Sequence, residues 1–360
     1  RVLVDSNSRF MEALKLYEEG RFRDAEFAYR NILKTNPTHA ESMHMLGVSI
    51  AQIGRHDEAI ELLRKSTEYA PDNPQFQNNL GEALRQSNQI DSAIIAFRNA
   101  IDIDEDNFEA HLNLSGIMVT RGELTKALRL ARSASELRPM NATAQVSLGE
   151  LLQLTDDQEG ALLAAERAIE IDPNYDKALN LKGFLLHEKG EHKESIPYFE
   201  AGLQANPLSA SCHRNLAAAL EAMNRFEDAA QIYQEQLRLA NSDPYPFIGL
   251  GRTNRFQKKY LAAERWLLDG LETFPKFCLL HCELGLTLIG LQRQKDAETH
   301  LMAAVSGLEP LPSANIEFGK FLLNEGRLAE AATQFKIALN HLPNDPEAAS
   351  GLAQALVKTN

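Results

Sequence analysis

Three residues that could bind metal lie close together near the end of the sequence. Cys278, His281 and Cys282 have the i, i+3, i+4 spacing that places three soft ligands on one face of a helix. A structural zinc site takes four ligands, however, and the repeat described below places these positions partly in a helix-hairpin core. A buried cysteine there behaves as a small apolar side chain. The pattern therefore favours core packing over a metal site.

Signatures of catalysis are absent from the rest of the sequence. It contains no Gly-rich phosphate loop after a strand, no Gly-x-Ser-x-Gly elbow and no His-Glu-x-x-His helix. The remaining histidines are scattered. The sequence therefore predicts no catalytic residue, no metal ligand and no cofactor, and its function has to be sought on its surfaces.

Composition limits the class of partner. With 37 Lys and Arg against 50 Asp and Glu, the chain has a formal net charge of −13. This charge argues against a general nucleic-acid binder, because such proteins neutralise phosphates with a basic surface. No stretch approaches the roughly 18 unbroken apolar residues of a membrane helix. We therefore expect a protein or peptide partner, no nucleic acid and no membrane insertion.

Cysteine usage and the first residues bear on the cellular compartment. The three cysteines are few and odd in number, so a reducing compartment fits better than a disulfide framework. The sequence begins Arg-Val-Leu-Val-Asp-Ser-Asn, without a basic region followed by an apolar core, so no export signal is visible. A cytoplasmic location is expected. A removed export signal stays open as an alternative, because the sequence lacks an initiator Met.

A 34-residue repeat organises the sequence. Seven prolines from Pro37 to Pro343 are separated by multiples of 34 residues, and the same register places Ala at nine of ten equivalent positions. Units that begin near residues 6, 40, 74, 108, 142, 176, 210, 244, 278 and 312 carry Gly at the eighth position in seven cases. Helix axes approach closely only where side chains are small, so we predict that this Gly of a first helix faces the twentieth-position Ala of a second. The proline then ends the second helix.

Periodicity within the units indicates two helices each. In the third unit, Leu80 and Leu84 mark one face of the first helix, while Ala93, Phe97 and Ala100 mark one face of the second. At the fifteenth position, a left-handed residue would cap the first helix, and glycine adopts that conformation most readily. The glycines found there are Gly20, Gly54, Gly122, Gly190 and Gly326. No segment has the pattern of a strand.

These residues resemble the tetratricopeptide repeat family, whose pattern has Leu, Gly, Ala, an aromatic residue, Ala and Pro at these offsets. The resemblance covers residues 6 to about 357 without an insertion. It implies an all-α, right-handed superhelical solenoid of ten tandem 34-residue helix-turn-helix repeats, with an unpaired C-terminal helix at residues 346–357. All 360 residues are expected to form this one domain.

The resemblance also implies that the first helices line a concave groove, with positions two, five, six, nine, twelve and thirteen pointing into it. At position six stand Asn79, Asn113 and Asn215. They are similar to part of the asparagine ladder that holds peptide backbone in the repeat arrays of O-GlcNAc transferases, since an amide both donates and accepts hydrogen bonds. The ladder is interrupted, for example at Met45 and Leu181, so ordinary surface asparagines are the alternative.

Charge along the presumed groove is polarised. Repeats 1–5 present Glu18, Glu41, Glu82, Glu109 and Glu150 against Arg85, whereas repeats 6–10 present Lys177, Arg214, Arg252, Arg255 and Lys320 against Glu188 and Glu221. Aromatic rings and an imidazole accompany the basic part, at Phe184, His187, Tyr245 and Phe256. We therefore predict that the basic half binds an acidic, carboxylate-bearing segment. The alternatives are an ordinary solvated surface and pairing of the arginines with Glu188 and Glu221.

These features predict a protein or peptide interaction scaffold that holds a partner segment in the groove. The alternative is the substrate-recognition arm of a larger enzyme, similar to the arrays that precede bacterial glycosyltransferase or sulfotransferase domains. The two-carboxylate clamp of chaperone-binding family members is absent, because Ala218 and Gly249 stand where Arg214 would need asparagine partners. The partner's identity and the oligomeric state are not predicted.

Overall fold

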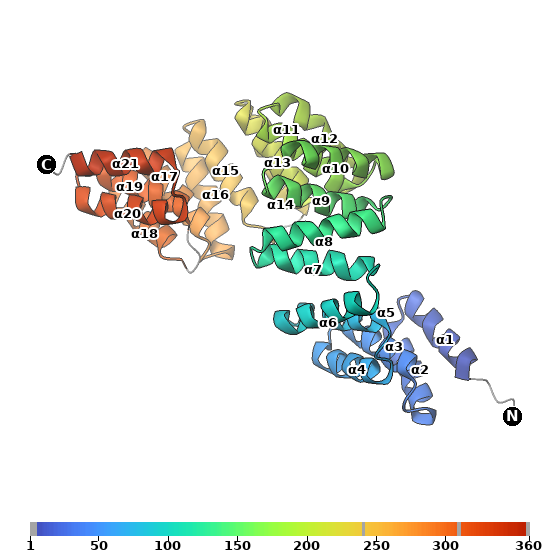
Figure 1. Ribbon diagram of the computed structural model, residues 1–360. Coiled ribbons are helices and arrows are strands. Elements are labelled where there is room, and N and C mark those ends of the chain that lie inside the picture. The colour runs from blue at the N-terminus through green and yellow to red at the C-terminus, as the bar shows by residue number, and fades with distance from the viewer. Residues whose placement is uncertain (1–5, 240–241, 308–310, 358–360) are drawn as a thin grey trace. The chain divides into compact units, whose positions relative to one another are not determined.

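The computed structural model describes residues 6–239, 242–307 and 311–357, and these residues form helices joined by short turns (Figure 1). The predicted all-α fold of ten helix-turn-helix repeats followed by one further helix is confirmed for this part of the chain. The helices fall into two compact units, residues 1–173 and residues 174–360. That both units belong to one right-handed solenoid stays a prediction.

In each repeat a first helix, helix A, precedes a second, helix B. The A helices of the first unit are α1 (Ser6–Glu18), α3 (Ala40–Gln52), α5 (Pro74–Gln86), α7 (Phe108–Thr120) and α9 (Ala142–Leu154). Its B helices are α2 (Phe22–Thr35), α4 (His56–Tyr69), α6 (Ile90–Ile103), α8 (Leu124–Leu137) and α10 (Gln158–Ile171).

The second unit repeats this arrangement. Its A helices are α11 (Asp176–Glu188), α13 (Ala210–Ala222), α15 (Tyr245–Phe256), α17 (Cys278–Gly290) and α19 (Pro312–Asn324). Its B helices are α12 (His192–Ala205), α14 (Phe226–Leu239), α16 (Tyr260–Thr273), α18 (Gln294–Val305) and α20 (Leu328–His341). The last helix, α21 (Pro346–Val357), packs Ala348 and Ala355 into the core that contains Phe335 of α20.

Capping residues explain where several A helices begin. The residue before α5, α7 and α9 is Asn73, Asn107 and Asn141, respectively. The side-chain oxygens of Asn107 and Asn141 each accept a hydrogen bond of 2.9 Å from the backbone N–H three residues later. Each bond satisfies an N–H that the first helical turn leaves unpaired, so the helix begins at the next residue.

The turn inside every repeat contains one residue in the left-handed backbone region. Five are the glycines predicted at the fifteenth position, with φ between 73° and 87°. The other five repeats use a residue with a side chain at the same position, with φ between 58° and 65°: Asn88, Asp156, Asn224, Lys258 and Gln292. The turn geometry is therefore common to all ten repeats, although only half of them carry the residue that adopts it without strain.

The eighth-position glycine lets a large side chain of helix B lie against the backbone of helix A. A Cβ atom placed at Gly81 would lie 2.7 Å from Cε1 of Phe97, the twenty-fourth residue of the repeat. Equivalent contacts pair Gly47 with Leu63, Gly183 with Phe199, Gly251 with Leu267, Gly285 with Leu301 and Gly319 with Phe335.

The predicted approach of this glycine to the twentieth-position alanine is found at Gly47 and Gly285, but the closer contact is with the twenty-fourth residue. The alanine contributes its backbone carbonyl oxygen, which would lie 3.2 Å from a Cβ at Gly47 in the case of Ala59. Positions twenty and twenty-four lie one helical turn apart on the same face, so the longer side chain fills the space in front of the glycine.

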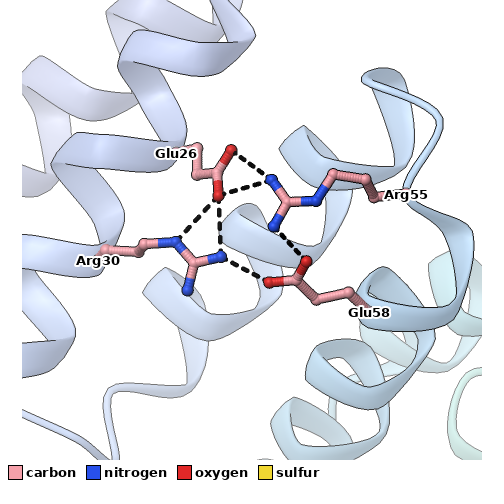
Figure 2. A network of polar contacts seen from close by, with 4 residues as sticks. All are labelled: Glu26, Arg30, Arg55 and Glu58. Carbon is pink, nitrogen blue, oxygen red and sulfur yellow. Dashed lines mark hydrogen bonds and ion pairs between the residues drawn. The ribbon is translucent and has the colours of Figure 1, made fainter.

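Ion pairs join the B helices of neighbouring repeats. Figure 2 shows Arg55, the sixteenth residue of its repeat and the residue before α4, between Glu58 of α4 and Glu26 of α2. Arg55 Nη1 lies 2.9 Å from Glu26 Oε1. Arg30 Nη2 closes the network at 2.8 Å from Glu26 and 2.6 Å from Glu58. The same positions pair Arg293 with Glu264 and Asp296, and Arg327 with Glu298 and Glu330.

We expect G81A to destabilise the first unit, because its new Cβ would lie within 3 Å of the Phe97 ring. Overpacking of this kind typically costs about 1–3 kcal/mol. The matched control is G116A in α7, where a Cβ would meet no atom within 4 Å and the change should stabilise by about 0.5–1 kcal/mol. Urea unfolding followed by circular dichroism measures both, and equal midpoints for the two variants would contradict the packing assigned to position eight.

A second prediction concerns the network of Figure 2. The hydrogen bond from Arg30, with the further bond from Arg55, holds the pKa of Glu58 below its usual value. The ionised Glu58 carboxylate therefore stabilises the folded chain fully above the unfolded-state glutamate pKa of about 4.3. This stabilisation is lost as the pH falls through the folded-state pKa of Glu58. At pH 7, the double variant E26Q/E58Q should exchange the amide protons of α2 and α4 faster than the native chain.

Once the pH falls below the folded-state pKa of Glu58, this difference should shrink, since that carboxylate is then protonated in the native chain too. Hydrogen exchange resolved by peptide reports α2 and α4 separately from the other helices. Identical exchange of native chain and variant at pH 7 would show that the network does not hold the two helices together.

Candidate partner-binding surfaces

The structure places the five predicted cations of the second unit on its A helices, but three of them have carboxylate partners within the chain. Arg252 pairs with Glu221, Arg255 pairs with Glu283, and Lys320 pairs with two glutamates. Arg214 and Lys177 form no ion pair with any described residue. The alternative that the arginines are neutralised internally therefore applies to Arg252 and Arg255.

Arg252 belongs to a partly buried polar cluster. Its Nε and Nη2 donate hydrogen bonds of 2.9 and 3.2 Å to the two oxygens of Glu221, and the Tyr233 hydroxyl donates one of 3.0 Å to the same carboxylate. Burial acts to lower the pKa of Arg252, but Glu221, Tyr233 and Glu283 together raise it. Burial and Glu221 also raise the pKa of Tyr233. The cluster is satisfied within the protein, so Arg252 is held in place.

The Tyr233 ring can reach this cluster because residue 249 is a glycine. A Cβ atom at Gly249, the sixth residue of its repeat, would lie 2.2 Å from the Tyr233 ring. Any side chain there would displace the ring from Glu221. The interruption of the asparagine ladder at this position thus has a packing cause.

The other two paired cations join neighbouring A helices. Arg255 of α15 donates bonds of 3.2 and 3.0 Å to Glu283 of α17, and both side chains are largely buried. Lys320 of α19 lies 2.9 Å from Glu317 of its own helix and 2.7 Å from Glu347 of α21. Burial acts to lower the pKa of Lys320, but the hydrogen bonds that it donates to these glutamates raise it overall.

Arg214 occupies a different environment. Its guanidinium carbon lies 4.6 Å from the centre of the Tyr245 ring, and that ring meets the edge of Phe277 with 5.7 Å between ring centres. Two consecutive repeats therefore contribute to one stack, since Phe277 is the last residue of the repeat that contains Tyr245 in α15. Tyr245 is 36% exposed, so the stack is open to solvent, and the N–H edge of the guanidinium has no carboxylate partner among described residues.

The remaining predicted residues of this surface lie on α11 and α15. Phe184 is half-buried beside the core that contains Phe199. Phe256 is 48% exposed and packs on Phe226. His187 approaches His192 of α12, with 2.9 Å between the two Nδ1 atoms. Phe184 and His187 thus support the A helix, while Phe256 leaves an aromatic face exposed.

The asparagines at position six form hydrogen bonds from one repeat to the next. Asn113 Nδ2 donates to Oδ1 of Asn78 at 3.2 Å, and Asn215 Nδ2 donates to Oδ1 of Asn180 at 2.9 Å. In both cases the acceptor is the fifth residue of the preceding repeat. Asn79 uses His44 in the same way, with 3.0 Å between Asn79 Nδ2 and His44 Nε2.

These bonds decide which amide groups remain for a ligand. Asn79 Oδ1 already accepts from Gln75 and Asn78, so its amide is fully engaged. Asn113 and Asn215 keep side-chain oxygens that accept from no described residue. Only these two of the three predicted asparagines can therefore accept a hydrogen bond from a bound peptide without losing an internal one.

The predicted acidic surface of the first unit is also partly neutralised. Glu82 lies 2.7 Å from Arg85, and Glu109 lies 3.4 Å from Arg138. Burial acts to raise the pKa of Glu82, but hydrogen bonds from Arg85 and Gln86 lower it overall. The difference in unpaired charge between the two halves is therefore smaller than the residue types at the groove positions predict.

The cysteine and histidine cluster is embedded in α17. Cys282 is buried, which raises its pKa to about 12 and keeps the thiol protonated. His281 uses both ring nitrogens, one at 2.9 Å from Nδ1 of His300 and the other at 3.0 Å from the carbonyl oxygen of Pro275. Within residues 6–239, 242–307 and 311–357, no group of three or more His, Cys, Asp or Glu is arranged to hold a metal ion.

Family models decide which family the chain belongs to. A tetratricopeptide repeat model matches residues 16–82, 51–97 and 186–246, and further models of the same repeat match residues 81–115, 119–176 and 164–196. Together these matches extend over more than half of the chain. The chain is a tetratricopeptide repeat protein. None of the helices in the described part of it is long and apolar enough to cross a membrane.

Three known proteins resemble it in sequence or in fold. Protein O-mannosyl-transferase Tmtc3 of Drosophila melanogaster is 28% identical over 98 residues, which are 26% of this chain and 11% of that protein. The Hsp70-Hsp90 organising protein of Plasmodium falciparum is 25% identical over 104 residues, 28% of this chain and 41% of that one. The chain thus spans less than half the length of these relatives. Yeast Tom70 has a similar fold, with a TM-score of 0.57, 13% identity and coverage of 98% of this chain and 88% of its own.

Several residues of this tetratricopeptide surface were not predicted. His44, Asn78 and Asn180 bond to position six of the next repeat, and a search for polar residues 35 positions apart would have found them. Glu283, at position six of its repeat, pairs with Arg255 and was not among the predicted groove charges. The signal for Tyr233 was the glycine at position 249, which could have been recognised as room for a ring.

The His187 and His192 pair predicts a pH dependence of stability. Burial, with the neighbouring His192, lowers the pKa of His187. The unfolded chain, with histidine pKa near 6.5, therefore binds more protons as the pH falls below about 6.5, and stability decreases in the acid direction. Thermal unfolding at pH 8 and at pH 5 should show a smaller loss of Tm for H187Q than for the native chain. An equal loss in both would mean that the pair does not contribute.

Proposed function

We propose that this chain is a protein-interaction scaffold, and that the A helices of its second unit bind an acidic, extended segment of a partner. The observation that carries the proposal is the stack of the half-buried Arg214 on the exposed Tyr245, which orients a guanidinium that has no carboxylate partner among described residues. Arginine suits this role because its planar fork binds a carboxylate through two hydrogen bonds.

Neighbouring groups support an extended ligand. Asn215 follows Arg214 on α13 and keeps an amide oxygen that accepts from no described residue. That oxygen can accept a backbone N–H of the segment whose carboxylate pairs with Arg214. Lys177, exposed at the start of α11, is a second cation for the same segment.

The paired cations have a different role in this proposal. Arg252, Arg255 and Lys320 are bound to Glu221, Glu283 and Glu347, so a ligand would have to displace a glutamate to contact them fully. Their pairs instead join α13 to α15, α15 to α17, and α19 to α21. Arg214 is accordingly the main electrostatic contact, with Lys177 as a weaker one.

The test uses R214E and a fluorescein-labelled peptide of alternating Glu and Ser, with binding followed by fluorescence anisotropy. R214E should raise the Kd by about tenfold or more, which is the effect of losing roughly 1.4 kcal/mol of interaction, and should reduce the salt dependence of binding. The control is R265E on α16, an exposed arginine without an ion pair among described residues, which makes the same charge change on a B helix.

Equal weakening by R214E and R265E would show that the peptide responds to net charge alone and would overturn the assignment. Y245A should weaken binding less than R214E, because it removes the ring that orients the guanidinium but leaves the charge. Circular dichroism of each variant checks that the helix content is unchanged.

A second candidate function rests on the similarity to Tmtc3, a protein whose name describes an O-mannosyl-transferase. On this alternative the repeats would be the substrate-recognition arm of a larger enzyme, and the same A-helix surface would hold the substrate protein. The full reading frame tests it: a transferase domain in the same polypeptide would favour the arm, and its absence would favour a free-standing scaffold.

A further inference from the structure

Helix α8 of the first unit is basic in strongly acidic surroundings. Residues 1–173 contain 28 Asp and Glu against 18 Lys and Arg. On α8 this balance is reversed, with Lys126, Arg129 and Arg132 against Glu136 alone. The helix is a B helix, so this positive surface differs from the A-helix surface discussed above.

The charges of the fourth repeat are inverted relative to the ion-pair pattern of Figure 2. Its sixteenth residue is Glu123 and its nineteenth is Lys126, and the two side chains pair with each other. Hydrogen bonding to Lys126, and then the charges of Arg121 and Arg98, lower the pKa of Glu123. Arg98 of α6 and Lys126 of α8 line the same depression, so both helices contribute a cation to it.

A depression between α6 and α8 collects three cations around an apolar floor. Arg98, Lys126 and Arg129 line it, with Asp102 as the one acidic residue. The floor consists of Ile101, Leu114, Met118 and Leu130. A guanidinium beside apolar side chains is well suited to a segment that presents a carboxylate next to an aliphatic residue.

A second depression adjoins the first along α8. Arg129 lines both, and the second adds Arg132, Leu128 and Ser133, with Glu136 at its end. Arg98, Arg129 and Arg132 are exposed and form no ion pair with a described residue. Three arginines along two neighbouring helices thus leave their N–H edges to solvent, in contrast to Arg30, which is bound to Glu26 and Glu58.

We propose that the outer face of α6 and α8 is a docking surface for an acidic protein segment in which an aliphatic side chain stands between carboxylates. The aliphatic side chain enters the depression over Leu114, Met118 and Leu130, and the flanking carboxylates pair with Arg98 and Arg129. Charge complementarity selects this occupant. A nucleic acid would be repelled by the excess of ten acidic residues in the unit and offers no aliphatic group to the floor.

The proposal does not depend on the surface around Arg214, and the experiment separates the two. In a chain carrying R214E, binding of a fluorescein-labelled Glu-Glu-Leu-Glu-Glu peptide is compared with and without R98E/R129E. The double reversal should raise the Kd by at least about tenfold, since it replaces two attractive contacts with repulsive ones.

The matched control is R23E/R167E, which makes the same change of net charge in the same unit. Arg23 of α2 and Arg167 of α10 are exposed and form no ion pair with a described residue. A second probe, Glu-Glu-Ser-Glu-Glu, removes the aliphatic side chain and should bind more weakly than the Leu peptide. Circular dichroism establishes that each variant keeps its helices.

Three outcomes would overturn the proposal. Equal weakening by the control would mean attraction by net charge rather than by this surface. Equal affinity for the Leu and Ser peptides would remove the role of the apolar floor. A dimer in sedimentation that R98E/R129E converts to a monomer, without an effect on the peptide, would assign the surface to a second copy of this chain.

Discussion

Close packing of helix A against helix B is the constraint on which the rest of the structure depends. The eighth residue of helix A must be small because the twenty-fourth residue of helix B lies directly against its backbone, as Phe97 does at Gly81. Once this contact is made, the rotation of both helices about their axes is fixed. The fixed rotation determines which side chains reach the next repeat, such as the position-five and position-six amides, and which reach solvent, such as Arg214.

Much of this architecture could be predicted from the sequence, because small residues, turn residues and prolines act locally and recur every 34 positions. The turn at the fifteenth position illustrates both success and limit. Glycine marked it in five repeats, but Lys258 and Gln292 adopt the same left-handed backbone without any signal in their residue type. There the two packed helices impose the conformation of the turn, and only the period of the repeat locates it.

The candidate site was less predictable, because an ion pair depends on two residues. The residue type at one groove position does not show whether a carboxylate from another repeat neutralises it. Arg214 and Arg252 are the same residue type on neighbouring A helices, yet one stacks on Tyr245 and the other is bound by Glu221 and Tyr233. The difference follows from glycine at position 249, which admits the Tyr233 ring. A close contact between backbone and ring thus decides which cation keeps its hydrogen-bonding capacity for a partner.

The ion pairs between B helices also bear on the order in which repeats can follow one another. Arg293 and Arg327 each meet a glutamate at the twenty-first position of the repeat before, so in-frame loss of the ninth repeat would bring Arg327 against Glu264 and keep the contact. The fourth repeat carries Glu123 at the sixteenth position, where the ninth and tenth repeats carry Arg293 and Arg327. If the fourth repeat were placed after the eighth or ninth, Glu123 would face Glu264 or Glu298, and the two carboxylates would repel each other. It follows the third repeat instead, whose twenty-first residue is the uncharged Ile94. Recombination can therefore lengthen or shorten the array near its C-terminal end more readily than it can move the basic repeat there.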